Sequence, residues 1–477
     1  MSTSPLVVYC LLALLLCAAP VSAQQVSPPA PILPIPTARQ LAWQEGGMRM
    51  FVHFGVNTFT DREWGDGTES PDLFQPAGFD ARQWARVARE TGFSTVILTA
   101  KHHDGFALWN SRYTDHDVAS SSWMGGGGDV VGALAEAVRE EGLGLGLYLS
   151  PWDQHEPSYG DEAGYNAFYL AQLRELLTQY GPITEMWFDG AKGENAKAMN
   201  YHFHAFWATV RQLQPGAVLF SDAGPDVRWI GNERGFAGES SWSTFDRSKV
   251  SIGATGIEKY LNEGDADGPD WVGGECDVSI RRGWFFHADQ EPKSVADLMD
   301  IYYKSEGRNC VLLLNIPPNR AGLLDDADVR RLQEFKAARE AVFTNDLARG
   351  ATAMVSNQRG GDDAFGPAGL FDDHMETYWA TDDTVRSASV IVDLPAGQTF
   401  NVIRLNEPIH LGQRVRAYRV EAEGDGQWST LVEGTTIGYR KLDRIATTTA
   451  GRLRITLLDA RGCPLLAGFG LYLDTAL

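Results

Sequence analysis

Between about Arg49 and Arg320, short apolar runs alternate with stretches that have the periodicity of amphipathic helices. The clearest runs are MFVHFGV, STVILTA, GLGLYLS, EMWFDGA and AVLFSDA. They begin roughly 30 to 50 residues apart, which is the spacing of successive strand and helix units in a parallel sheet. Strands that are apolar on both faces need cover on both sides, so the pattern predicts either a (β/α) barrel or a doubly wound sheet.

The stretches between the runs carry helix start and stop signals. Asp80 and Asp129 are predicted N-caps, and glycines close the two helices that follow, Gly92 and Gly142 respectively. Two further helices are expected over residues 165–180 and 197–213. Residues 271–318 contain the strand-like runs GGECDVSI and CVLLLNIPP around a loop that the pattern does not place.

Polar residues at the ends of the runs decide between the two architectures. In chain order they are His53; Lys101, His102 and His103; Ser150, Trp152 and Asp153; Asp189; and Asp222. In a barrel the carboxyl ends of the strands converge on one face, where active sites are built, whereas an open sheet spreads them along an edge. We therefore predict an α/β fold in which residues 35–345 form a (β/α)8-like barrel catalytic domain.

The pattern changes after a helix expected near residues 325–342. From about Gly350 onward, short alternating runs such as SASVIVDL, NVIRLNE, AYRVEAE and LRITLLD are separated by Gly, Asp and Pro. This texture predicts that residues 346–477 form an all-β sandwich. Within it, LFDDHMETYWAT and DGQWSTL resemble the discoidin-type or carbohydrate-binding modules of secreted glycosidases. This domain could either support the barrel or bind sugar, and the sequence does not decide between these two roles. Asp372 and Asp373 are candidate ligands for a structural Ca²⁺ there.

The first residues resemble a secretory signal. An apolar stretch runs through Leu16 and is followed by Val21, Ser22 and Ala23, so residues 1–23 are predicted to be a signal peptide. Cys17 raises a lipoprotein alternative, which the bulky Leu16 before it disfavours. Residues 24–34 read as an extended proline-rich leader. The protein is therefore expected to be exported, to a periplasmic or extracellular location, with no other segment apolar enough to span a bilayer.

Composition and charge limit the partners. The 477 residues are 44% apolar and 11% aromatic, enough for large cores, and the formal net charge is −21. That charge repels nucleic acids and anionic membrane surfaces. Removal of the signal leaves Cys276, Cys310 and Cys463, whose spacing fits neither a disulfide framework nor a metal motif, so buried thiols are expected. A bridge between Cys276 and Cys310 is the alternative.

Two kinds of chemistry fit the polar strand ends. In a metal-dependent hydrolase, His53, His102, His103 and Asp189 would supply ligands. In a glycosidase, paired carboxylates would act on a sugar held by histidines and tryptophans. Adjacent His102 and His103 would point to opposite sides of a strand, which weakens the metal interpretation.

A set of motifs then resembles one known family. RMFVHFGVNTF, REW, ILTAKHHDGFALW, GLYLSPWD, EMWFDGA, GNERG and SEGRNCVLLLNIPPNRAGL occur in the order found in the α-L-fucosidases of glycoside hydrolase family twenty-nine. The resemblance covers roughly Ile35 to Val342, and the combination of AKHHDGF with WFDGA is specific. It implies an exo-acting, retaining enzyme that removes terminal L-fucose from fucosylated glycans through a fucosyl-enzyme intermediate and needs no cofactor.

The resemblance also assigns catalytic residues. Asp189 matches the family nucleophile, and Glu233 in WIGNERG resembles the acid/base of the branch that prefers α-1,3 and α-1,4 linkages. In a retaining enzyme the two carboxyl groups lie about 5–5.5 Å apart, and the acid/base has a raised pKa. Glu275 is a rival for the acid/base, with Glu239 behind it.

The remaining site residues are expected to bind the sugar. Hydroxyl-binding positions of the family are matched by His53, Glu63, Trp64, His102, His103 and Tyr148. Trp187 and Trp284 are candidate platforms for the apolar face and methyl group of fucose. A fucose-binding protein without catalysis and a metal-dependent barrel hydrolase remain the alternative functions, and the oligomeric state is open.

Overall fold

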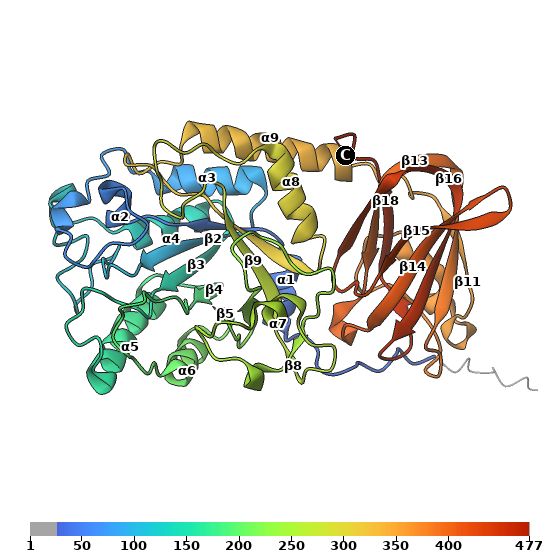
Figure 1. The fold of residues 1–477 in the computed structure, drawn as a ribbon, viewed down its shortest axis with the longest axis horizontal. Helices are drawn as coiled ribbons and strands as arrows, with labels where there is room; N and C mark the ends of the chain where they lie inside the picture. The colour runs from blue at the N-terminus through green and yellow to red at the C-terminus, as the bar shows by residue number, and fades with distance from the viewer. Residues whose placement is uncertain (1–25, 477) are drawn as a thin grey trace, which may run out of the picture.

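Two parts follow one another along the chain, a barrel and a β-rich domain (Figure 1). The structure, a computed structural model, describes residues 26–476. The predicted signal peptide, Cys10 and Cys17 lie outside the described residues.

Eight parallel strands close the barrel. In spatial order they are β1 (Arg49–Val52), β10 (Cys310–Asn315), β9 (Gly273–Ser279), β6 (Val227–Trp229), β5 (Val218–Ser221), β4 (Glu185–Trp187), β3 (Gly144–Leu149) and β2 (Thr95–Lys101). Closure is direct, because Met50 of β1 pairs with Val96 of β2 on one side and with Leu314 of β10 on the other. The predicted barrel is therefore confirmed, and the doubly wound sheet is excluded.

The sequence pattern did not predict one of the barrel strands. The five runs became β1 to β5, and GGECDVSI and CVLLLNIPP became β9 and β10, but β6 comprises only Val227–Trp229. Three residues are too few to show a period, and the central one is Arg228. This arginine is fully buried and donates hydrogen bonds to the carbonyls of Leu261 and Trp242 at 2.8 and 2.9 Å, which is why it is tolerated there.

Helices surround the barrel and carry the predicted caps. They are α1 (Ala38–Glu45), α2 (Val56–Thr60), α3 (Ala81–Thr91), α4 (Val130–Glu140), α5 (Glu162–Gln179), α6 (Phe203–Leu213), α7 (Glu258–Glu263), α8 (Val295–Lys304) and α9 (Asp326–Phe343). The Asp80 carboxylate accepts from the amides of the first turn of α3, and Asp129 does so for α4. The prediction for residues 197–213 was wrong at its start, since α6 begins at Phe203.

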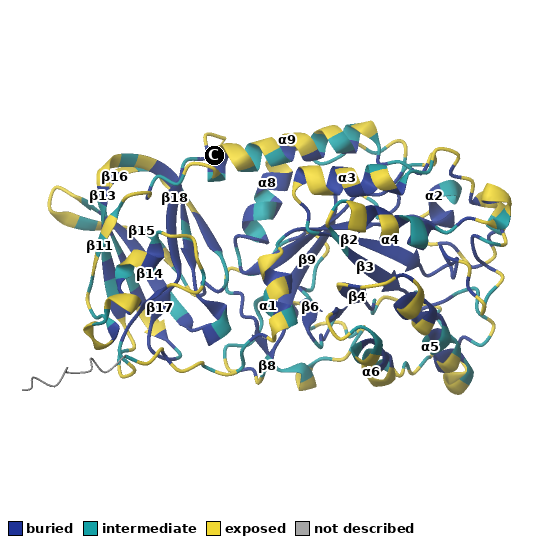
Figure 2. Cartoon of the chain, turned by 180° about the vertical axis from the view of Figure 1, so that it is seen from behind, coloured by how far each residue is buried: buried dark blue, intermediate teal, exposed yellow. Residues whose placement is uncertain are grey.

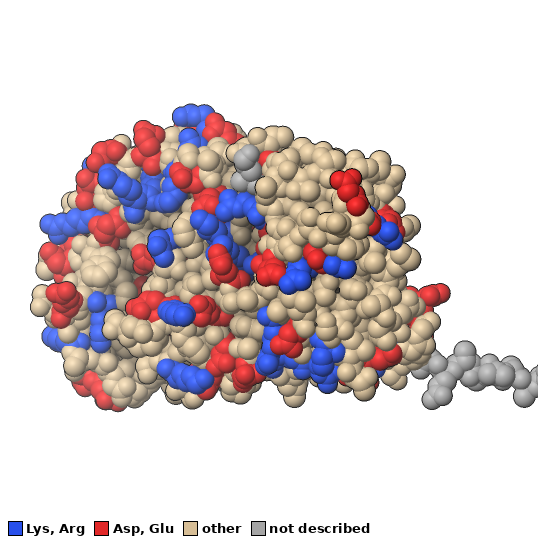
Figure 3. All heavy atoms as spheres, turned by 45° about the vertical axis from the view of Figure 1, so that its right-hand side comes forward, with Lys and Arg blue, Asp and Glu red and all other residues tan. Residues whose placement is uncertain are grey.

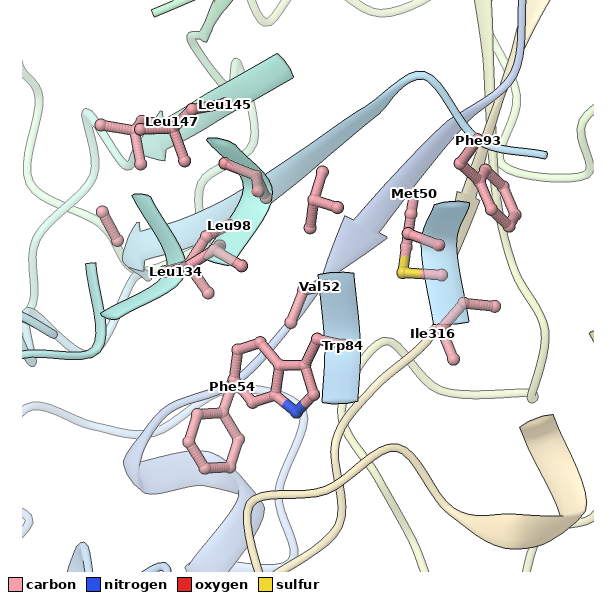
Figure 4. Close-up of a cluster of buried hydrophobic side chains, with 14 of the residues drawn as sticks. Met50, Val52, Phe54, Trp84, Phe93, Leu98, Leu134, Leu145, Leu147 and Ile316 are labelled. Atoms are coloured by element: carbon pink, nitrogen blue, oxygen red, sulfur yellow. The ribbon is translucent and has the colours of Figure 1, made fainter. Parts of the chain in front are cut away.

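Side-chain alternation along the strands divides the core in two. Met50 and Val52 of β1 face outward and pack with Trp84 of α3, as Figure 4 shows. Phe51, between them, faces the barrel interior with Trp187 and other strand residues. In Figure 2 the strands are accordingly buried and the outer helix faces exposed. The inner set forms the floor beneath the carboxyl ends of the strands.

The second domain is an antiparallel sandwich, as predicted. Its strands are β11 (Thr352–Val355), β12 (Trp379–Ala380), β13 (Ala388–Asn406), β14 (Val415–Gly424), β15 (Gln427–Gly434), β16 (Lys441–Ala460), β17 (Leu465–Leu466) and β18 (Gly468–Tyr472). A two-stranded ribbon, β7 (Thr244–Phe245) with β8 (Asp270–Trp271), belongs to the barrel loops. The runs SASVIVDL and NVIRLNE, which suggested two strands, lie in the single strand β13, whose pairing register shifts between them.

The N-terminal leader packs along the second domain. Residues 26–34 contain no helix or strand, in keeping with the predicted extended segment. The Ile32 amide donates to the Leu411 carbonyl at 3.0 Å, and Arg414 Nη2 donates to the Ala30 carbonyl at 2.7 Å. The leader thus links the sandwich to α1 at the start of the barrel (Figure 1).

Several smaller predictions concern side chains and surfaces. Cys276, Cys310 and Cys463 are buried and free, so the alternative bridge is absent. Asp373 pairs with Arg404 at 2.5 Å while Asp372 accepts from Thr377 at 2.7 Å, and their predicted calcium role stays a prediction. Among the described residues no helix is long and apolar enough to cross a membrane. On the face in Figure 3, cationic and anionic side chains are interspersed.

A buried carboxylate organises the sandwich near the barrel. Glu407, fully buried, accepts hydrogen bonds from the amides of Arg414, Val415 and Gly438 at 2.7, 2.9 and 2.7 Å. Gly438 lies against Asn309 of the barrel, where a Cβ atom would come within 2.2 Å of that side chain. The same carboxylate therefore holds the loop that meets the barrel.

We expect Glu407→Ala to destabilise the sandwich by about 3–5 kcal/mol, because three buried amides lose a charged acceptor. Calorimetry should show a lower unfolding temperature for this domain. Glu433→Ala is the control, since its exposed pair with Arg419 contributes about 0.5 kcal/mol or less. Similar effects of the two substitutions would contradict the assigned role of Glu407.

Candidate active site

A pocket of about 860 Å³ opens at the carboxyl ends of the barrel strands. All ten site residues expected from the sequence line it. They are His53, Glu63, Trp64, His102, His103, Tyr148, Trp187, Asp189, Glu233 and Trp284. They come from different strands and from the loops that follow them, and the barrel brings them together.

Asp189 lies two residues beyond the end of β4 and is held on both carboxylate oxygens. The Tyr148 hydroxyl donates to Oδ2 at 2.9 Å, and the Ala191 amide donates to Oδ1 at 2.7 Å. Gly190 allows the chain to turn here, because a Cβ atom at this position would lie 2.3 Å from an Asp222 oxygen. The result is a fixed carboxylate at the pocket wall.

His102 and His103 both line the pocket, contrary to the expectation that adjacent residues would diverge. Strand β2 ends at Lys101, so the alternation of a strand no longer applies to the two histidines. Lys101 itself is fully buried outside the pocket and binds Asp153 at 2.7 Å and Gln172 at 2.9 Å.

Hydrogen bonds assign the tautomer of two histidines. The Ser150 hydroxyl donates to the Trp152 carbonyl at 2.6 Å, so His103 Nδ1, 2.7 Å away, must donate to Ser150. The Asn315 side-chain oxygen accepts from the His53 amide, so His53 Nδ1, 2.9 Å away, also carries hydrogen. In the neutral forms each Nε2 is left as an acceptor for a ligand hydroxyl.

Burial favours the neutral form of all three histidines. Burial lowers the pKa of His53 to about 3 and that of His102 well below its ordinary value. Burial also lowers the pKa of His103, although the charges of Asp189 and Asp153 offset part of the effect. His103 Nε2 lies 3.6 Å from Asp189 Oδ2, close enough for the carboxylate charge to act on the imidazole.

Glu233 lies on the loop after β6, at the opening of the pocket. The residue is exposed to solvent, but partial desolvation by the surrounding protein raises its pKa, and the charges of Asp189 and Glu63 raise it further against the hydrogen bond from Trp284. That bond runs from Trp284 Nε1 to Glu233 Oε2 at 3.3 Å. Two carboxyl groups in one pocket thus have different surroundings, the arrangement that separates an acid from a nucleophile.

Glu63 has a partner that the sequence analysis missed. Its Oε2 accepts from the Trp284 amide at 2.8 Å, and its Oε1 lies 2.6 Å from His287 Nε2. Burial lowers the pKa of His287, but Glu63 and Asp61 outweigh it and the net pKa is raised. Nothing in the sequence singles out His287, which is 224 residues from Glu63.

Aromatic rings cover the floor and one side of the pocket. Trp187 stacks on Phe220 with centroids 3.9 Å apart and planes 7° apart. Trp64 is 47% exposed and stands edge-on to His103, 5.4 Å away. Flat apolar surface beside hydroxyl acceptors is suited to a sugar ring.

Two further carboxyls line the pocket. Asp222 follows β5 and accepts from the Gly253 amide at 2.6 Å; Asp277, in β9, accepts from Trp229 Nε1 at 2.9 Å. Burial raises the pKa of Asp277 well above its ordinary value and that of Asp222 to about 6. The sequence pattern pointed to Asp222, a polar residue at the end of an apolar run. It did not single out Asp277, because the pattern did not place the segment around GGECDVSI in the fold.

The rival acid/base candidates lie outside the pocket. Glu275 is fully buried beneath it, where it accepts from Trp187 Nε1 at 2.9 Å. Glu239 points to solvent with a side chain 89% exposed, 3.8 Å from Arg308. Within residues 26–476, no three His, Cys, Asp or Glu side chains are grouped as ligands of a metal ion.

A closed barrel with fixed carboxyls, neutral histidines and aromatic walls at its carboxyl face defines a glycoside hydrolase. Comparison with known proteins identifies the family. Residues 40–337 match the α-L-fucosidase family and residues 351–467 match the F5/8 type C domain, so the chain belongs to the α-L-fucosidases of glycoside hydrolase family 29.

Relatives match nearly the whole chain. Alpha-L-fucosidase 1 of Arabidopsis thaliana is 50% identical over 450 residues, covering 94% of this chain and 89% of its own. The crystal structure of SpGH29 has a TM-score of 0.90 at 42% identity, covering 94% of this chain and 100% of its own. A Ruminococcus gnavus family 29 fucosidase in complex with fucose has a TM-score of 0.88 at 37% identity, covering 94% and 97%.

Asp222 should make stability depend on pH. Its pKa of about 6, above the 3.8 of an ordinary Asp, means that the folded protein holds a proton that the unfolded chain has released. This contribution to stability is present below about pH 4 and is lost as pH rises through about 6. The Tm of wild type relative to Asp222→Asn should therefore fall over that range.

Asp246→Asn is the control with the opposite sign, because hydrogen bonds from Ser248 lower the pKa of the partly exposed Asp246. Wild type should gain Tm relative to this variant as the pH rises. Parallel Tm profiles for wild type and Asp222→Asn would contradict the raised pKa of Asp222.

Proposed function

We propose that this chain is an exo-acting, retaining α-L-fucosidase that hydrolyses terminal α-1,3/1,4-linked L-fucose on oligosaccharides or glycoconjugates. The observation that carries the proposal is the pair of carboxyls in one pocket, Asp189 held by Tyr148 and the Ala191 amide, and Glu233 with a raised pKa. A fucosidase of similar structure binds fucose, which supports the sugar assignment.

In the first step Asp189 attacks the anomeric carbon of fucose and the glycosidic C–O bond breaks. Glu233 gives its proton to the departing oxygen, so the aglycone leaves as a neutral alcohol. The fucose is then an ester of Asp189. Partial desolvation and the charge of Asp189 favour the protonated Glu233 that this step requires.

In the second step the ionised Glu233 takes a proton from water, which attacks the same carbon. The ester bond to Asp189 breaks, and fucose leaves with the configuration it had in the substrate. Formation of the ester removes the charge of Asp189, which had raised the pKa of Glu233. The acid therefore becomes a better proton acceptor when it must act as a base.

The neutral histidines are suited to orient the sugar. Nε2 of His53 and of His103 are acceptors, so ring hydroxyls can donate to them at fixed positions. Trp187 offers the floor against which the apolar face of the ring rests. These contacts alone would be sufficient for a fucose-binding protein. Binding does not require Asp189 and Glu233 in the same pocket, whereas catalysis does.

Export to the periplasm or the exterior stays a prediction from residues 1–23. The same holds for the absence of a catalytic cofactor.

Asp189→Ala should lower kcat by about 10⁴-fold or more, the scale expected when a covalent nucleophile is removed. Azide should restore turnover and yield β-L-fucosyl azide, because it enters on the face that the carboxylate vacates. Wild type with azide is the control and should give fucose. Substantial activity of the variant without azide would exclude Asp189 as the nucleophile.

Glu233→Ala should lose about 10²–10⁴-fold on a branched fucosylated trisaccharide and much less on an aryl fucoside whose phenol needs no proton. Glu239→Ala, an exposed glutamate nearby in sequence, is the control and should match wild type. Equal losses on both substrates would refute the acid/base assignment. The wild-type rates on the two substrates also test the linkage preference, since an α-1,3/1,4 enzyme favours the trisaccharide.

A further inference from the structure

Two carboxyl groups meet inside the barrel, beneath the pocket. Glu185 comes from β4 and Glu275 from β9, and both are fully buried. Each carboxyl lies close enough to the other to shift its pKa. Hydrogen-bond donors reach only one oxygen of each. Arg49 Nε and Trp43 Nε1 donate to Glu185 Oε2 at 2.8 and 3.2 Å, and Trp187 Nε1 donates to Glu275 Oε1 at 2.9 Å.

The two remaining oxygens have no donor among the described residues. These are Glu185 Oε1 and Glu275 Oε2. An orphaned buried acceptor costs about 1–3 kcal/mol, and two neighbouring carboxylates also repel each other. A single proton between them removes both problems, because the protonated carboxyl donates to the other.

Charge decides which carboxyl holds the proton. The cation of the cluster is Arg49, which pairs with Glu185 and leaves Glu275 without a positive partner of its own. Burial raises the pKa of both carboxyls. For Glu185 the charge of Arg49 offsets part of this effect, whereas for Glu275 the charge of Glu185 adds to it, so the pKa of Glu275 is raised well above its ordinary value. With Glu185 ionised and Glu275 neutral, the buried cluster has no net charge.

We propose that Glu275 is a carboxylic acid that donates to Glu185 and thereby positions Trp187 under the sugar. The role rests on the proposed fucosidase function. Trp187 Nε1 has Glu275 as its acceptor, and its ring contacts Tyr148, 5.3 Å between centroids. Tyr148 in turn donates to Asp189. A displaced Trp187 would therefore disturb both the floor of the pocket and the support of the nucleophile.

This role separates Glu275 from the acid/base. Glu275 does not line the pocket, and its carboxyl accepts from the indole of Trp187, which does. Its proton serves the cluster and is not transferred to substrate. Glutamine reproduces this geometry, because its carbonyl accepts from Trp187 while its amide donates to Glu185 Oε1.

Infrared difference spectroscopy of wild type against Glu275→Gln, at neutral pH, tests the proton directly. We expect wild type to show the C=O stretch of a protonated carboxylic acid, shifted in D₂O, that the variant lacks. Absence of this band from the difference spectrum would overturn the proposal. This measurement does not depend on turnover, so a wild-type protein without fucosidase activity would refute the proposed function and leave the proton assignment standing.

Kinetics test the positioning. Glu275→Gln should keep kcat/KM within about threefold of wild type on the trisaccharide, while Glu275→Leu, which cannot hold Trp187, should lose at least about tenfold, mainly in kcat. Loss of the trisaccharide but not the aryl fucoside in Glu275→Gln would show acid/base chemistry and overturn the proposal. Wild-type kinetics in Glu275→Leu would also overturn it.

Glu175→Gln is the matched control for a general loss of stability. Glu175 is another buried carboxyl that accepts from an indole, Trp109 Nε1 at 3.0 Å, and it does not line the pocket. Its substitution should lower Tm without changing kcat or KM. If Glu275→Leu does not fold, the glutamine variant and the infrared band still decide the proposal.

Discussion

Closure of the barrel, through the pairing of β1 with both β2 and β10, is the constraint on which the site depends. Parallel strands that close on themselves must present all their carboxyl ends on one face. Residues as far apart as His53 and Trp284 then line one pocket. Because strands are stiff and held by ladders on both sides, the side chains just beyond their ends are held in place before any sugar arrives.

Burial gives that pocket its chemistry. The same loss of water that lowers the pKa of the histidines raises that of Glu233 and Asp277, because in each case it disfavours the charged form. Neutral imidazoles accept from hydroxyls, and a protonated carboxyl can donate. Asp189 is held in place by two donors, a tyrosine hydroxyl and a backbone amide. Position in the barrel thus separates the roles of chemically similar groups.

Burial also determines the properties of the polar cluster beneath the pocket. Arg49, Glu185 and Glu275 form a buried cluster inside the barrel, beneath Trp187 of the pocket floor. Its hydrogen bonds end on the indole groups of Trp43 and Trp187. A buried polar network of this kind fixes orientation, because an indole without its acceptor would leave an unpaired donor. The floor of the pocket is thereby rigid as well as apolar.

The sequence alone determined much of this protein. Apolar runs at strand and helix spacing predicted the barrel, alternation predicted the sandwich, and motifs pointed to ten of the residues that line the pocket, since these features are local in the chain. Only the tertiary structure decided what depends on distant contacts. It brings His102 and His103 into one pocket and places Glu275 beneath it. It also shows that Asp277 lines the pocket and that His287 binds Glu63. Burial and hydrogen bonding between residues up to 224 positions apart set these properties, and no local pattern records them.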